Sequence, residues 1–116
     1  MIIMRITMTA LIEKQKEMLQ TLQSMIRPHS YDPGCLKVRV YRDLEKENEL
    51  ILMSEWKTRS ALKKYMMSDR FSALLGTKSL LAKPMDMEIL TVSHMEGMET
   101  MDALRHKPIL ERRRLI

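Results

Sequence analysis

The chain has 116 residues, of which 45% are hydrophobic and 30% charged, a composition typical of one globular domain and not of a disordered chain. No stretch approaches the roughly 18 consecutive apolar residues of a membrane helix, and no signal-peptide core is present, so we expect a cytoplasmic protein without a membrane partner. The net charge of +5 lies partly in the C-terminal residues, and only 4% of residues are aromatic, so we expect a solvated basic tail and no nucleic-acid partner.

The first half of the chain predicts a strand, a helix and a hairpin. Period-two alternation over residues 2–10 predicts the first strand, and apolar residues at helical spacing predict an amphipathic helix over residues 14–27. A Tyr-Asp-Pro-Gly turn follows. Residues 35–43 and 49–56 then form the two arms of a hairpin. On the first arm we expect Leu36, Val38 and Val40 to share one face.

The second half predicts two helical pieces and a last strand. Thr58 is placed to cap the first helix, and Ser68 or Asp69 starts the second, which Pro84 ends. Residues 85–94 alternate as a strand. A short helix over residues 98–105 follows, and residues 107–116 show no clear period. We therefore divide the chain into a folded domain over residues 1–95 and a short helix with a basic tail over residues 96–116.

This order of elements, β-α-β-β-α-β, is the ferredoxin-like pattern of the α+β class, with helices on one side of an antiparallel sheet. The strands, however, carry apolar residues on both faces: Ile51 and Met53 on one, Leu50, Leu52 and Trp56 on the other. Because helices can cover only one face, we expect a second copy to cover the other. The chain is then a homodimer whose sheets pack face to face and enclose a dry chamber near the indole.

Common catalytic motifs are missing. A single cysteine, Cys35, allows neither an intrachain disulfide nor a zinc site that needs two thiolates, and it is expected to be a small buried hydrophobe. The three glycines and three histidines match no nucleotide-binding or metal-binding spacing, and no G-x-S-x-G motif is present. We therefore expect no cofactor and no metal.

Four short motifs follow one another at characteristic distances. Together they resemble the antibiotic biosynthesis monooxygenase (ABM) family, which includes small quinol monooxygenases, over about residues 1–92. The resemblance implies a dimeric α+β barrel. It also implies an oxidoreductase that oxygenates a quinol or related aromatic dihydroxy compound with O₂, without metal or flavin, in a mostly apolar pocket. The motifs are Asp32-Pro33-Gly34-Cys35-Leu36, Val40-Tyr41-Arg42-Asp43, Glu55-Trp56-Lys57 and Ser68-Asp69-Arg70-Phe71.

The resemblance also implies the site residues. Trp56 lies where the family has a pocket-lining tryptophan, and Tyr65 lies on the next helix, where many members carry a histidine; these two are the expected catalytic residues. Because Trp56 is a large ring in a small protein, it is also a natural core residue. The residues expected to contact substrate are Thr7, Arg39, Leu52, Ser54, Met66 and Phe71.

Two of these positions show why alternatives stay open. Leu52 replaces an asparagine of the antibiotic-pathway enzymes, which leaves Ser54 as the nearest polar residue on that face. Arg39 either stabilises a substrate phenolate, pairs with a carboxylate or reaches the rim of the dimer; the same holds for Arg5, and Glu55 is a partner by type for both. The alternative function is a non-catalytic dimeric module that binds a small ligand or fills its pocket with its own side chains.

A third function is haem degradation. The relatives with that activity use an asparagine on the first strand and a histidine on the helix that follows the tryptophan. This chain has Ile6-Thr7-Met8 and Tyr65-Met66 there, and neither replaces an imidazole ligand to iron.

Overall fold

A computed structural model describes the backbone of residues 1–29 and 32–115, and the side chains of residues 1–26 and 32–106. No helix in these described segments has the length and apolar character needed to span a membrane. The elements in chain order are β1 (Ile2–Thr9), the 3₁₀ turn η1 (Ile12–Lys14), α1 (Gln15–His29), β2 (Cys35–Arg42), β3 (Glu49–Trp56), α2 (Arg59–Met66), α3 (Asp69–Leu75), the 3₁₀ turn η2 (Gly76–Leu80), β4 (Asp86–Thr91) and α4 (Met98–Leu115).

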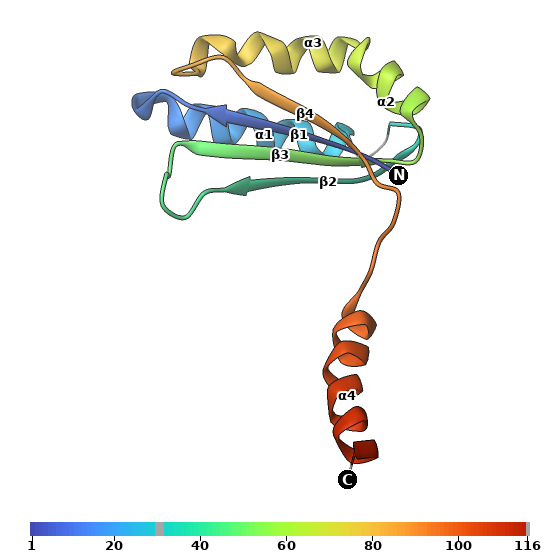
Figure 1. Cartoon of the computed structure of the whole chain (residues 1–116). Helices are drawn as coiled ribbons and strands as arrows, with labels where there is room; N and C mark the ends of the chain where they lie inside the picture. The colour runs from blue at the N-terminus through green and yellow to red at the C-terminus, as the bar shows by residue number, and fades with distance from the viewer. Residues whose placement is uncertain (30–31, 116) are drawn as a thin grey trace.

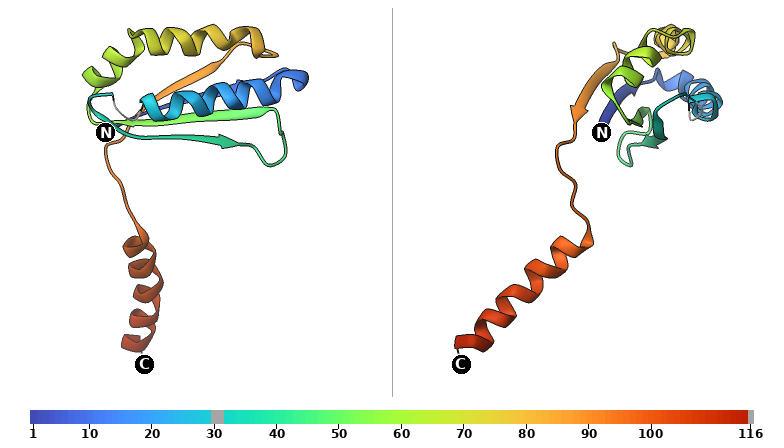
Figure 2. Two further views of the ribbon diagram at one scale, coloured as in Figure 1. Left: turned by 180° about the vertical axis from the view of Figure 1, so that it is seen from behind. Right: turned by 90° about the vertical axis from the view of Figure 1, so that its right-hand side faces the viewer.

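The four strands form one antiparallel sheet in the order β2-β3-β1-β4. Helices α1, α2 and α3 lie together on one side of it (Figures 1 and 2). This arrangement confirms the expected α+β ferredoxin-like fold. The first two strands of the chain are separated in the sheet by β3, so that β1 and β3 form its centre and β2 and β4 its edges.

Side-chain alternation gives the sheet two different faces. On β1 the even-numbered residues from Ile2 to Met8 are buried against the helices, whereas the odd-numbered residues are only partly buried. The register pairs Met4 with Ser54 and Ile6 with Leu52, which therefore share the helix side, here named the covered face. The opposite side, named the open face, carries Ile3, Arg5, Thr7, Lys37, Arg39, Tyr41, Ile51, Met53, Glu55, Glu88 and Leu90.

Strand β2 departs from the expected alternation at its start. The register shifts between Cys35 and Lys37, so that Leu36 has no partner on β3 and is 57% exposed. The expectation that Leu36 faces inward with Val38 is therefore wrong, because a β-bulge inserts one residue and changes the direction of its side chain. Val38, beyond the bulge, is buried as expected.

The two helices that follow β3 begin at side-chain caps. The Thr58 hydroxyl oxygen accepts a hydrogen bond from the backbone N–H of Ala61 at 3.1 Å, and the Ser68 oxygen accepts one from Phe71 at 3.3 Å. These caps satisfy N–H groups that the helices leave unpaired. They start α2 and α3 at the residues the sequence indicates, and thereby direct Tyr65 and Phe71 onto the sheet.

The C-terminal helix differs from expectation. A single helix, α4, runs from Met98 to Leu115, so the prediction of a short helix that ends at residue 105 is wrong. Pro108 and the run of arginines interrupt the apolar period on which a sequence-based boundary depends. Seen along the strands, α4 extends away from the sheet on the side opposite the other helices, which is the side of the open face (Figure 2).

Candidate active site

An aromatic cluster lies between the sheet and helices α2 and α3. Trp56, the last residue of β3, has no exposed surface, and its ring stacks on Tyr65 of α2 with centroids 5.0 Å apart and planes at 25°. Tyr65 in turn meets the Phe71 ring of α3 edge to face at 5.4 Å. Strand β3 thus supplies one ring and the two capped helices supply the others, so the cluster depends on both caps.

The indole is oriented by one hydrogen bond. Its Nε1–H donates to the Ser54 hydroxyl oxygen at 2.9 Å, and both groups are buried. Residues two apart on a strand point to the same face, which is why Ser54 reaches the ring. A buried indole N–H without an acceptor is costly, so Ser54 both satisfies the ring and fixes its rotation.

Tyr65 remains protonated at neutral pH. Burial raises the pKa of its phenol, the nearby carboxylate of Asp32 and the thiol of Cys35 raise it further, and the positive charge of Arg70 opposes them. A phenol in this state donates a hydrogen bond and does not serve as a base.

Asp32 is a polar group of this site that sequence reasoning assigned only to a turn. One of its carboxylate oxygens pairs with Arg70 Nη1 at 2.9 Å. The other, Oδ2, is buried and accepts no hydrogen bond from any residue in the described segments. A buried acceptor without a donor is uncommon in folded proteins. Its position in the Asp-Pro-Gly motif was the available signal, but only the fold brings it beside Tyr65.

The remaining expected site residues divide between the two faces of the sheet. Leu52 and Ser54 are buried on the covered face, where Met66 packs partly buried against the same core. Thr7 and Arg39 lie on the open face, so the sheet separates them from the aromatic cluster within one subunit. For the same reason the expected chamber between two face-to-face sheets would not adjoin the indole, which faces the helices.

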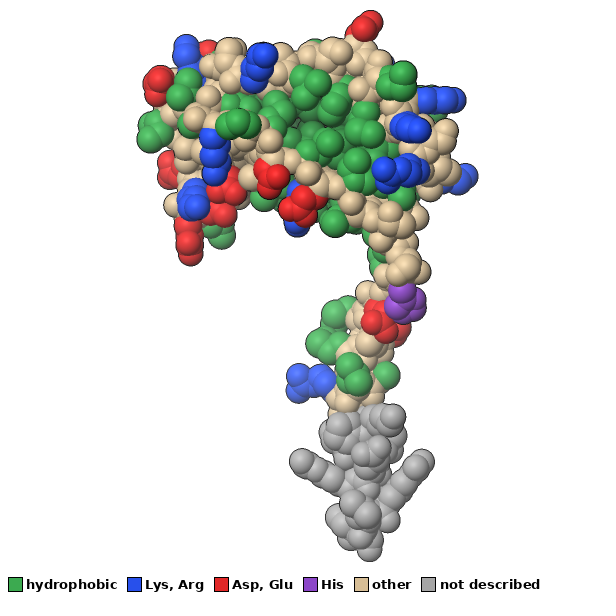
Figure 3. All heavy atoms as spheres, turned by 45° about the horizontal axis from the view of Figure 1, so that its top comes forward, with side chains coloured by type: hydrophobic (Ala, Val, Ile, Leu, Met, Phe, Trp, Pro, Cys, Tyr) green, Lys and Arg blue, Asp and Glu red, His purple; other side chains and the backbone are tan. Residues whose placement is uncertain are grey.

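An apolar surface reaches solvent along the edge of the covered face. Ile89 pairs with Met4 and Met87 pairs with Ile6, so both side chains of edge strand β4 face the helix side. Ile89 and Met85 pack partly buried against the core, and Met87 is exposed. Figure 3 shows the hydrophobic side chains gathered on this side of the domain. Met85, Met87 and Ile89, here named the apolar flank, give the covered face an apolar margin along strand β4, at the edge of the sheet.

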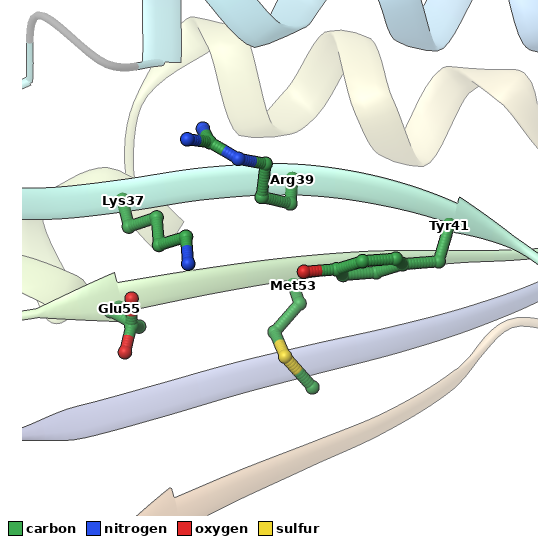
Figure 4. Close-up of a pocket in the computed structure, with 5 residues that line it drawn as sticks. All are labelled: Lys37, Arg39, Tyr41, Met53 and Glu55. Atoms are coloured by element: carbon green, nitrogen blue, oxygen red, sulfur yellow. The ribbon is translucent and has the colours of Figure 1, made fainter.

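The open face has a hollow of its own, with a volume of about 80 Å³. In Figure 4 the Tyr41 hydroxyl lies next to Met53, whereas the Arg39 guanidinium points away from it. Arg39 donates to the backbone carbonyl of Val38 at 2.8 Å. Arg5 pairs across the strands with Glu88 at 2.6 Å, so the expected partner Glu55 is wrong for this arginine. The hollow is lined by Lys37, Arg39, Tyr41, Met53 and Glu55.

Comparison with known proteins identifies the family. Residues 1–75 match the family model described as antibiotic biosynthesis monooxygenase. This chain belongs to the ABM family. Within the segments that the structure describes, no three His, Cys, Asp or Glu side chains are grouped as ligands for a metal ion.

Relatives of this ABM protein include an uncharacterized protein of Synechocystis sp., 26% identical over 85 residues. That match covers 72% of this chain and 58% of the relative, so the chain spans less than two thirds of the relative's length. A conserved protein from Methanosarcina mazei Go1 has a TM-score of 0.72 and 26% identity, with 77% and 89% of the two chains covered. A variant of SnoaB, a cofactor-independent oxygenase from Streptomyces nogalater, has a TM-score of 0.71 and 12% identity over 81% and 94% of the chains, and so shares the fold.

Proposed function

We propose that this ABM protein is a cofactor-independent monooxygenase that oxidises a quinol or related aromatic dihydroxy compound with O₂. The observation that carries the proposal is the stacked Trp56–Tyr65 pair on the covered face, where Met66, Met85 and Ile89 pack against the same core. A flat aromatic substrate fits against rings and thioethers, and apolar walls exclude water from the reaction. Tyr65 donates a hydrogen bond to one substrate oxygen.

The proposed chemistry needs a proton acceptor and no redox group of the protein. Deprotonation of one quinol hydroxyl gives an anion, which transfers one electron to O₂. The resulting semiquinone and superoxide combine, one oxygen atom enters the ring, and the other leaves as water, so that quinol and O₂ give a hydroxyquinone and water. We assign the first proton to Asp32, because its Oδ2 is buried near Tyr65 and accepts no hydrogen bond from the residues that the structure describes.

Oxygen uptake with a panel of reduced quinols and naphthols tests the function. We expect protein-dependent uptake with at least one compound and a lower rate for Trp56→Phe at unchanged oligomeric state. Leu44→Ala, at the exposed tip of the β2–β3 hairpin, is the matched control and should keep the full rate. Rates that do not depend on the protein across the whole panel would refute the proposal.

Asp32→Asn tests the base separately. It keeps the shape of the side chain but removes the proton acceptor, so kcat should fall at least tenfold. Arg70→Gln removes the charge of the ion-pair partner but keeps the carboxylate, so an equal loss in that variant would indicate that Asp32 acts only through its ion pair with Arg70. In that case the monooxygenase proposal stands and the assignment of the base fails.

The second candidate is a non-catalytic ligand-binding module, and one observation favours it. The Trp56, Tyr65 and Phe71 rings are almost completely buried by neighbouring side chains. Since Trp56 is the one tryptophan, its fluorescence reports on this site directly. Ligand-dependent quenching without oxygen uptake would select the module, and a Soret band on haem titration would select haem binding.

We further propose that the protein is a homodimer formed through the open face. Ile3, Ile51, Met53 and Leu90 give this face apolar surface that the chain's own helices leave uncovered. Thr7 and Arg39 then belong to the interface and not to the substrate site. Sedimentation that shows a folded monomer at micromolar concentration would exclude this assembly.

A further inference from the structure

Helix α4 carries apolar residues that its own domain does not cover. Met95, just before the helix, and Met98, Met101 and Leu104 within it are between 44% and 74% exposed. In Figures 1 and 2 the helix stands apart from the sheet and from the other helices. An isolated helix of this length is marginally stable in water and gains most of its stability from packing. This segment, residues 95–104, is named the docking segment.

The docking segment is acidic, and one end of the domain is basic. Glu96, Glu99 and Asp102 alternate with the apolar residues of the segment. The exposed side chains at the start of β2 and α2 include one apolar and three basic residues, Leu36, Lys37, Lys57 and Arg59. They are neighbours in space, because the backbone N–H of Lys57 donates to the carbonyl of Gly34 and Cys35 pairs with Trp56. This surface is named the basic end.

The start of α2 adds to the positive charge that the basic end presents to the docking segment. The first turn of α2 contains no acidic residue, so the partial positive charge of the helix N-terminus adds to the charge of the basic end. The exposed Leu36 gives the same surface an apolar contact for a methionine. The basic end therefore offers positive charge to the acidic residues of the docking segment and an apolar side chain to its methionines.

Charges on the open face indicate how two copies align. Lys37 and Arg39 lie on β2 at one edge, and Asp86 and Glu88 lie on β4 at the other. Face-to-face packing with β2 of one copy over β4 of its partner brings these opposite charges together. The two-fold axis then runs along the strands, and the same end of both sheets lies on the same side.

In this alignment α4 departs beside the partner's basic end. Packed sheets lie roughly 10 Å apart. The connection over residues 92–97, fully extended, spans at most roughly 20 Å, which is enough to carry the start of α4 past the partner's sheet. Figure 2 shows α4 directed to the side of the open face.

We propose that the docking segment of each chain binds the basic end of a second copy, so that α4 clasps the partner across the open-face dimer. This inference rests on the dimer proposed above. The pairs that form are Glu99 and Asp102 with Lys57 and Arg59 of the partner subunit, around a centre made by Met98, Met101 and the partner's Leu36.

Sedimentation equilibrium of the 116-residue chain tests the clasp. Met101→Glu should raise the dimer dissociation constant at least tenfold, because it places a charge in the apolar centre of both contacts. Leu44→Glu, at an exposed apolar position on the hairpin far from both contacts, is the control and should leave the constant unchanged. Neither side chain belongs to the buried core, so the domain should keep its unfolding midpoint.

A charge exchange tests the pairing itself. Asp102→Lys and Arg59→Glu should each weaken the dimer several-fold, and the double variant should recover most of the lost affinity. A weaker dimer for Met101→Glu without recovery in the double variant would overturn the assigned partner surface. An unchanged dissociation constant for Met101→Glu would overturn the clasp. That conclusion would also hold if the variant bound anionic vesicles less tightly than the wild-type chain, because α4 would then contact a membrane and not a second copy.

An open-face variant separates this inference from the dimer on which it depends. Ile51→Glu should produce monomers. If it does so while Met101→Glu has no effect, the face-to-face dimer stands and only the clasp fails. If the wild-type chain is monomeric at micromolar concentration, both fail together.

Discussion

The hydrogen bond between Trp56 and Ser54 allows a quantitative prediction from two buried groups. In Ser54→Ala the indole N–H keeps its burial but loses its acceptor at 2.9 Å. An unsatisfied buried donor costs about 1–3 kcal/mol, and removal of one hydroxyl from a tight site adds little cavity volume. The expected loss of unfolding free energy is therefore about 2 kcal/mol.

A double-mutant cycle isolates this bond from the packing of the ring. Trp56→Phe removes the donor together with part of the ring, and should cost about 2–3 kcal/mol through lost packing. In the double variant no donor is left unsatisfied, so Ser54→Ala should cost almost nothing in the Trp56→Phe background. The coupling energy should then be about 2 kcal/mol.

Urea unfolding followed by far-UV circular dichroism is the suitable assay. Fluorescence would not serve, because Trp56→Phe removes the one tryptophan. All four proteins should show the same m-value if the surface exposed on unfolding is unchanged. A coupling energy within about 0.3 kcal/mol of zero, the usual range for independent sites, would refute the view that Ser54 satisfies and orients the indole.

Three further predictions concern the turns and the phenol. Thr58→Ala should cost about 1 kcal/mol by removal of the α2 cap, measured by urea unfolding with Thr58→Ser as the control that keeps it. Gly34→Ala should cost at least about 1 kcal/mol, since Gly34 has φ +82° and an added Cβ would lie 2.6 Å from the Ala61 Cβ; a neutral result would contradict the turn geometry. Because burial raises the pKa of Tyr65 above the unfolded value near 10, the folded protein keeps a proton that the unfolded chain loses. Stability is then full below pH 10 and falls above it, and Tyr65→Phe should reduce this decrease in alkaline unfolding curves.

Much of the fold follows from local sequence patterns. Alternation over β1 and β3 specifies strands, because a side-chain period of two fits only a pleated strand, and Thr58 and Ser68 mark the starts of α2 and α3 through their oxygens. The sequence also predicts that Trp56 ends the strand β3. Local signals failed at Leu36, because a bulge depends on how two strands pair, and at the end of α4, where Pro108 obscured the period.

The composition of the site was decided by tertiary structure. Sequence indicates that Thr7, Arg39 and Trp56 lie on strands, but which face each residue joins depends on strand order and on the side to which the helices pack. The sheet therefore separates Thr7 and Arg39 from the indole, and it brings Asp32 from a turn to the neighbourhood of Tyr65. The physical reason is that periodicity is a property of neighbouring residues, whereas a site is made by residues far apart in the chain whose proximity only packing creates.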